Sequence, residues 1–151
     1  MDGDVADDLA LLTGLYRATN AVVRELDLRL SREEGVTFVQ AMMLLAVRSF
    51  DQPQPHMLAE HLSQQSQTVT GVLDRLERAG HIARLRDMGD RRAVRLELTP
   101  SGEALVHRME SALEGHVDAV VGGMDAHKRA VLREQLELLE HSARRHNGVQ
   151  E

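Results

Sequence analysis

The sequence contains no cysteine and no tryptophan, and only three of its 151 residues are aromatic. Without cysteine, the chain cannot form a disulfide, hold a metal through thiolates or sense oxidants through a thiol. No stretch approaches the roughly 20 apolar residues of a transmembrane helix. The first residues, 1–4, lack the basic start of a secretory signal. We therefore expect a cytoplasmic protein without a membrane partner.

Recognisable catalytic motifs are also missing. The sequence has no nucleophile beside a base, no glycine-rich phosphate loop and no paired carboxylates near a histidine. We therefore expect no enzymatic activity and no cofactor. The length of 151 residues suits a single domain, and the apolar share of 42% is enough for a hydrophobic core.

The net charge of −6 is unevenly distributed. Residues 64–95 carry seven arginines and four acidic residues, a net charge of +3, which leaves −9 for the rest of the chain. Arginine suits bidentate contacts with phosphate and guanine, and acid elsewhere would keep other surfaces away from DNA. An ordinary solvated surface could show the same imbalance, so charge alone does not assign a nucleic-acid partner.

Apolar residues recur with helical spacing along most of the chain. They predict helices over about residues 6–30, 38–47, 100–122 and 125–145. The second of these is apolar nearly all round, which indicates burial at the centre of the fold. Four residues mark expected helix ends: Thr37 with its capping-box partner Gln40, Gly80, Thr99 before Pro100, and Asp125.

Residues 58–99 have the pattern of a helix-turn-helix followed by a β-hairpin. A helix over 58–62 and a turn over 63–66 precede a second helix over 67–79. The second helix places Val69, Val72, Leu73 and Leu76 inward. It leaves Gln67, Gly71, Asp74 and Arg78 on the opposite face, flanked by Thr68, Thr70 and Arg75. Two β-prone segments, 81–86 and 93–99, flank an arginine-rich tip at 87–92.

Three blocks of this region resemble the MarR family of winged helix-turn-helix regulators. Asp90 to Thr99 matches the family's D-x-R-x5-L-T wing signature, Leu58-Ala59-Glu60 and 69–77 match its helix-turn-helix, and 99–102 matches the entry to its next helix. One departure is Gln64, at a turn position that is usually apolar in the family. A glutamine there either tilts the second helix or bonds to a neighbouring backbone group.

The resemblance implies a mainly α fold with a small β-wing, forming a single MarR-type domain over 1–151. Within it we expect a winged helix-turn-helix DNA-binding lobe at 36–99 and dimerisation helices at 5–30 and 100–146. The implied function is a ligand-responsive repressor that binds a near-palindromic operator as a homodimer. The apolar stripes at the two ends of the chain, which need a partner surface, also favour a two-fold dimer over packing within one chain.

The candidate DNA-binding residues lie in the second helix and at the wing tip. Gln65 or Ser66 is expected to cap the second helix, and a threonine methyl, glutamine or arginine can contact base edges in the major groove. Gly71 either allows close approach to the DNA backbone or is simply tolerated at an exposed site. The resemblance implies that Arg92 enters the minor groove and that Asp90 orients it. The full set is Ser66, Gln67, Thr68, Thr70, Gly71, Arg75, Asp90, Arg91 and Arg92.

Two further sets of residues are weaker candidates. The family's effector pocket implies a small-molecule ligand near Leu15, Tyr16, Met42, Met43 and Leu45, and plain hydrophobic core is the alternative for each. A zinc site and a solvated surface are the two interpretations of one helix face, and the second is favoured, so no metal is expected. That face carries Glu103, His107, Glu110 and Glu114.

A protein-interaction module with a winged helix is the alternative function. An arginine-rich wing argues against it, because a wing retired from DNA contact would have little need for so many cations. The arginines concerned are Arg84, Arg86, Arg91, Arg92 and Arg95.

Overall fold

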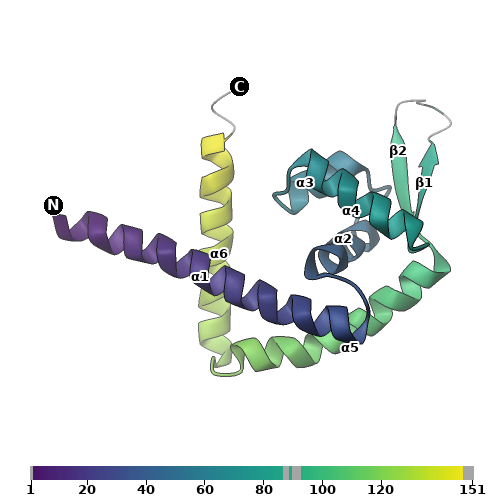
Figure 1. Cartoon of the computed structure of the whole chain (residues 1–151). Helices are drawn as coiled ribbons and strands as arrows, with labels where there is room; N and C mark the ends of the chain where they lie inside the picture. The colour runs from purple at the N-terminus through teal and green to yellow at the C-terminus, as the bar shows by residue number, and fades with distance from the viewer. Residues whose placement is uncertain (1, 87–88, 90–92, 148–151) are drawn as a thin grey trace. The chain divides into compact units, whose positions relative to one another are not determined.

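The computed structural model of the protein describes residues 2–86, 89 and 93–147 (Figure 1). Its helices and strands follow in the order α1 (Asp2–Glu33), α2 (Phe38–Ser49), α3 (Pro55–His61), α4 (Ser66–Arg78), β1 (Ile82–Arg86), β2 (Val94–Leu98), α5 (Pro100–Val121) and α6 (Ala126–Asn147). The sequence-based prediction of a mainly helical fold with one small hairpin is confirmed. The helix predicted over about 6–30 extends over 2–33, and the one predicted over 58–62 begins earlier, at Pro55.

Contacts divide the chain into two units, residues 1–113 and 114–151, and the boundary falls inside α5. Each unit is described separately. Within the described residues, no helix is both long and apolar enough to cross a membrane.

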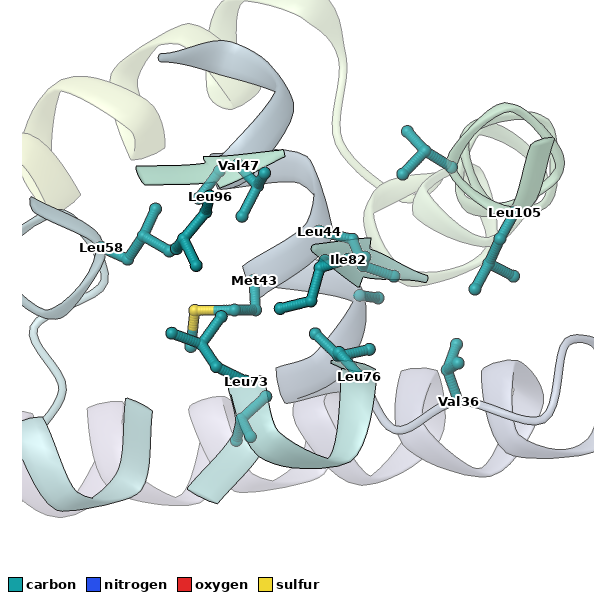
Figure 2. Packing of buried hydrophobic residues seen from close by; sticks show 14 of the residues in the cluster. Val36, Met43, Leu44, Val47, Leu58, Leu73, Leu76, Ile82, Leu96 and Leu105 are labelled. Atoms are coloured by element: carbon teal, nitrogen blue, oxygen red, sulfur yellow. The ribbon is translucent and has the colours of Figure 1, made fainter. Parts of the chain in front are cut away.

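The first unit is built around α2, as its apolar composition predicts. The capping box at its start is present: the Thr37 hydroxyl accepts from the Gln40 amide, and the Gln40 side chain accepts from the Thr37 amide. Met43, Leu44 and Val47 of α2 are buried. Figure 2 shows them packed among side chains from α3, α4, both strands, α5 and the loop before α2, namely Val36, Leu58, Leu73, Leu76, Ile82, Leu96 and Leu105.

The hairpin is antiparallel, with Ile82 opposite Leu98 and Arg86 opposite Val94. Ile82 and Leu96 are buried, so one face of the hairpin closes the core. The amide of Leu96 also donates to the carbonyl of Pro53, at 2.8 Å, which fixes β2 to the loop after α2. The base of the wing is therefore held by both packing and backbone hydrogen bonds.

The second unit contains the end of α5 and α6. Asp125 caps α6 as predicted, because its carboxylate accepts from the Lys128 amide at 2.8 Å. Gly122 begins the turn, and a Cβ at this residue would lie 2.3 Å from the carbonyl oxygen of Asp118. Arg129 then bonds to Asp118 and to the Met124 carbonyl, which holds the turn in place.

Exposed large apolar side chains are confined to the terminal helices among the described residues. In α1 they are Val5, Leu9, Leu11, Leu12, Leu15, Tyr16 and Leu28, and in α5 and α6 they are Val117, Val131, Leu132, Leu136, Leu138 and Leu139. Between Val36 and Thr99 none occurs in the described part of the chain. The large apolar side chains of residues 36–99 are therefore covered by a core that Leu30 of α1 and Leu105 and Met109 of α5 help to form, whereas many apolar side chains on the terminal helices stay exposed.

Candidate nucleic-acid interface

Helix α4 is the exposed second helix of the helix-turn-helix. Its inward stripe is the predicted one, with Val69, Val72, Leu73 and Leu76 buried against α2 and β1. The remaining candidates on this helix therefore lie outside the core. Ser66, Gln67, Thr68, Thr70 and Arg75 are exposed, and Gly71 is half-exposed.

The N-terminus of α4 differs from the prediction in one respect. Gln65 is the N-cap by its extended backbone, but neither it nor another described residue caps the helix through a side chain. The preceding Ser63 has a left-handed backbone, with φ of 49°. The first amides of α4 thus remain available to an anion such as a DNA phosphate.

Gln64 does not pack between the two helices of the motif. Its side chain is exposed, and its backbone N–H donates to the carbonyl of Ala59 at 2.9 Å. A backbone bond at this turn needs no particular side chain. A glutamine is accommodated here because the side chain points into solvent.

Thr70 and Gly71 differ in what they offer to a ligand. The Thr70 hydroxyl donates to the carbonyl of Ser66 at 2.9 Å, so its methyl group and its oxygen lone pairs remain for an outside partner. A Cβ built on Gly71 would meet no described atom within 4 Å. Packing inside the chain therefore does not explain the glycine. Close approach of α4 to the DNA backbone and simple tolerance of glycine at an exposed site both remain predictions.

The C-terminus of α4 is tied to the start of α5. Gly80 has φ of 78°, and the amides of Gly80 and His81 bond to carbonyls in the last turn of α4, as in a Schellman motif. The Thr99 hydroxyl donates to the Gly80 carbonyl at 2.6 Å and accepts from the Gly102 amide at 3.0 Å. A Cβ on Gly102 would lie 2.0 Å from the His81 carbonyl oxygen, so only glycine fits this approach. Sequence reasoning predicted the two caps but not the junction that they form.

Arg84 connects the wing to α4. It follows Ile82 on the same face of β1, and beyond the edge of the core its guanidinium bonds to Asp74 at 2.7 Å and to Glu77 at 2.5 Å. Partial burial lowers the pKa of Arg84, but the two carboxylates outweigh this effect and raise the pKa above its ordinary value. Arg84 therefore has an intramolecular role. The sequence interpretation counted it as a sign of DNA contact, but its presence alone does not indicate such contact.

The wing tip lies outside the described residues. Asp90, Arg91 and Arg92 remain predictions for that reason. Of the neighbouring arginines, Arg86 is exposed and Arg95 lies 3.9 Å from Glu97.

The candidate effector residues fall into two groups. Leu15 and Tyr16 are exposed on α1, by 37% and 71%. Met43 is completely buried in the core, and Met42 and Leu45 are half-buried against it. None of the five lines the open hollow of about 340 Å³ between the end of α2 and β2, whose walls include Phe50, Pro53, Arg95 and Leu98. Their ligand contact remains a prediction.

The face of α5 that carries Glu103, His107, Glu110 and Glu114 is partly engaged within the protein. Glu110 is ion-paired with Arg48 of α2. Within the described part of the chain, no group of three or more histidine or acidic side chains is placed to hold a metal ion.

The fold and the exposed helix α4 define a winged helix-turn-helix protein. Residues 34–93 match the model of the MarR family. The chain is 30% identical over 129 residues to the HTH-type transcriptional regulator TtmR of Methylorubrum extorquens, an alignment that covers 85% of this chain and 65% of TtmR. The winged helix-turn-helix of this chain is therefore of the MarR type. The chain spans only 37% to 65% of the lengths of the curated relatives that it matches.

Solved structures agree with this assignment. The structure of Bordetella bronchiseptica BpsR, described in terms of regulation of DNA binding by 6-hydroxynicotinic acid, aligns with a TM-score of 0.78 at 26% identity, covering 86% of this chain and 98% of that one. A MarR variant from E. coli in complex with operator DNA has the same fold, with a TM-score of 0.80 at 24% identity and coverage of 88% and 95%. The relatives are named transcriptional regulators and not enzymes, which agrees with the expectation of no catalysis.

Proposed function

We propose that this protein is a transcriptional regulator that binds double-stranded DNA by placing α4 in the major groove. The observation that carries the proposal is the exposed polar face of α4, on a helix whose other face is locked into a complete core. Gln67 can pair with adenine, Arg75 with guanine, and the methyl groups of Thr68 and Thr70 can contact thymine. A regulator that binds operator DNA would act in the cytoplasm.

Related structures that were solved with DNA support this proposal. The E. coli MarR variant was solved with operator DNA, and a Staphylococcus aureus MepR structure, with the same fold, was solved with DNA. Wing residues Asp90, Arg91 and Arg92 complete the proposed interface, with Arg92 in the minor groove.

The active form is a homodimer built from the terminal helices. Exposed apolar residues in α1 and α6 support this, because clusters of such side chains on a small protein mark interaction sites. Two copies of α4 in a dimer would contact half-sites separated by about one helical turn of DNA, roughly 34 Å, which implies a near-palindromic operator.

Regulation is by repression that a small-molecule effector relieves. Support comes from BpsR, whose structure is described as a mechanism for regulation of its DNA binding by 6-hydroxynicotinic acid. The ligand of BpsR does not identify the effector of this chain. Leu15, Tyr16, Met42, Met43 and Leu45 are the first positions to test for contact with it.

Selection from a pool of randomised duplexes tests the proposal. We expect a near-palindrome to be enriched and its affinity to fall steeply with salt, because arginines displace counterions from phosphates. Weak binding without sequence preference, in the presence and absence of added zinc, would contradict it. That result would favour a winged helix that docks on another protein.

A further inference from the structure

We propose that Arg84 does not contact DNA but neutralises Asp74 and Glu77, two carboxylates on α4, so that this helix can approach phosphates. The inference rests on the proposed DNA binding and assigns a positioning role to a residue beside the interface. The guanidinium bonds to both carboxylates at once, at 2.7 Å to Asp74 and 2.5 Å to Glu77.

The two carboxylates lie close to the candidate DNA-binding face. At 100° per residue, Asp74 follows Gly71 and Gln67 on the outer side of α4, opposite the buried stripe. Glu77 is three residues further on, so it neighbours Asp74 on the helix surface. The side chains of Asp74 and Glu77 are 44% and 41% exposed. Without a cation, both would face the phosphates that α4 approaches.

Arg84 reaches this position from the wing. It shares a face of β1 with buried Ile82, and the side chain of Arg84 is only 26% exposed. A residue held from two sides by carboxylates and backed by the core is poorly placed to reach out to DNA. It is well placed to keep like charges from repelling the phosphate backbone within the Debye length of about 8–10 Å at moderate salt.

A double-mutant cycle tests the neutralising role of Arg84. Its four proteins are the wild type, Arg84→Gln, Asp74→Asn with Glu77→Gln, and all three substitutions together. Affinity for the selected operator duplex is measured at low and at high salt. Arg84→Gln is expected to weaken binding about tenfold at low salt, since it leaves two uncovered carboxylates beside the phosphates. In the background that lacks both carboxylates, the same substitution should change affinity by no more than about twofold.

The pair of carboxylate substitutions gives a second, independent readout. It should tighten binding, because it removes two negative charges from the side of α4 that approaches the phosphates. If the ion pairs serve only to hold the wing against α4, breaking them from the α4 side should weaken binding instead. The proposal also requires the loss caused by Arg84→Gln to shrink at high salt.

Arg32→Gln is the matched control. Arg32 is an exposed arginine near the end of α1, 3.7 Å from Glu33, and its substitution changes net charge equally without touching α4. Its affinity should stay within about twofold of the wild type. Melting temperatures of all variants should be close together, since partly exposed ion pairs contribute little to folding.

The outcomes separate this inference from the proposed function. If the wild type selects no operator, DNA binding itself is refuted. If the wild type binds, the inference is overturned when Arg84→Gln costs as much in the neutral background as in the wild type, which would show direct contact. It is also overturned when the carboxylate substitutions weaken binding.

Discussion

Gly71→Ala distinguishes the two explanations for a glycine in the middle of α4. In the free protein, the added methyl group would meet no described atom within 4 Å. The only effect on folding is therefore the gain in helix propensity, about 1 kcal/mol in favour of the folded state. For a chain of this size, that corresponds to a rise in melting temperature of about 2–4 °C.

The effect on DNA binding is expected to have the opposite sign. Gly71 lies on the outer side of α4 between Gln67 and Arg75, where the helix backbone would come nearest to the duplex. A methyl group at that point would hold α4 away from DNA and weaken its other contacts together. We expect a loss of affinity of about tenfold, or about 1.4 kcal/mol, measured by titration of the selected operator.

Gly14→Ala in α1 is the matched control. Gly14 is also a helical glycine whose added Cβ would meet no described atom within 4 Å, and at 100° per residue it lies on the side of α1 away from Leu12 and Tyr16. It should give the same gain in stability without loss of affinity per dimer. A Gly71→Ala protein that is more stable and binds with unchanged affinity would refute close approach and leave tolerance as the explanation. A less stable protein would refute the structural reasoning itself.

Three further substitutions test other parts of the structure. Gly102→Ala should destabilise the protein by about 3 kcal/mol in urea titration, because its Cβ would lie 2.0 Å from the His81 carbonyl oxygen; a loss below about 1 kcal/mol would mean that α5 shifts freely. Arg92→Ala should weaken operator binding by about tenfold or more at an unchanged melting temperature, whereas a large drop in melting temperature would show a structural role. Leu12→Glu, at a side chain that is 59% exposed, should convert a dimer into a monomer in sedimentation experiments; an unchanged mass would place the interface elsewhere.

Local signals predicted the ends of the elements well. The capping residues Thr37, Thr99 and Asp125 each bond to an amide three residues ahead, so the partner is specified within one turn of the chain. Gly80 is predictable for the same reason, since its positive φ is required directly after the last residues of α4. The inward stripe of α4 follows from the helical period alone.

Contacts between elements were not predictable in this way. Arg84 lies ten residues from Asp74, and their pairing depends on how the hairpin leaves α4. The sequence shows only an arginine in a basic wing. The approach of Gly102 to His81 likewise depends on where α5 passes the start of β1. A glycine within a helix and next to a capped N-terminus is nevertheless a signal that could have suggested a close backbone contact.

The same difference between local signals and contacts between elements applies to the candidate site. Which residues of α4 face outward is fixed by the core on its other side, so Gln67, Thr68 and Arg75 could be proposed from the sequence. The effector residues could not be resolved, because a methionine in a core and a methionine in a pocket give the same apolar pattern. Met43 is buried in the core itself, while Tyr16 is largely exposed.

The distribution of exposed apolar side chains links the fold to the proposed assembly. Among the described residues, all the large ones lie in α1, α5 and α6, and none lies between Val36 and Thr99. A dimer formed by the terminal helices would bury them and leave α4 of each protomer free for DNA. Because dimerisation stabilises only the folded state, the melting temperature should rise with protein concentration. A melting temperature that stays constant over a hundredfold range of concentration would mean that the terminal helices are stable without a second copy.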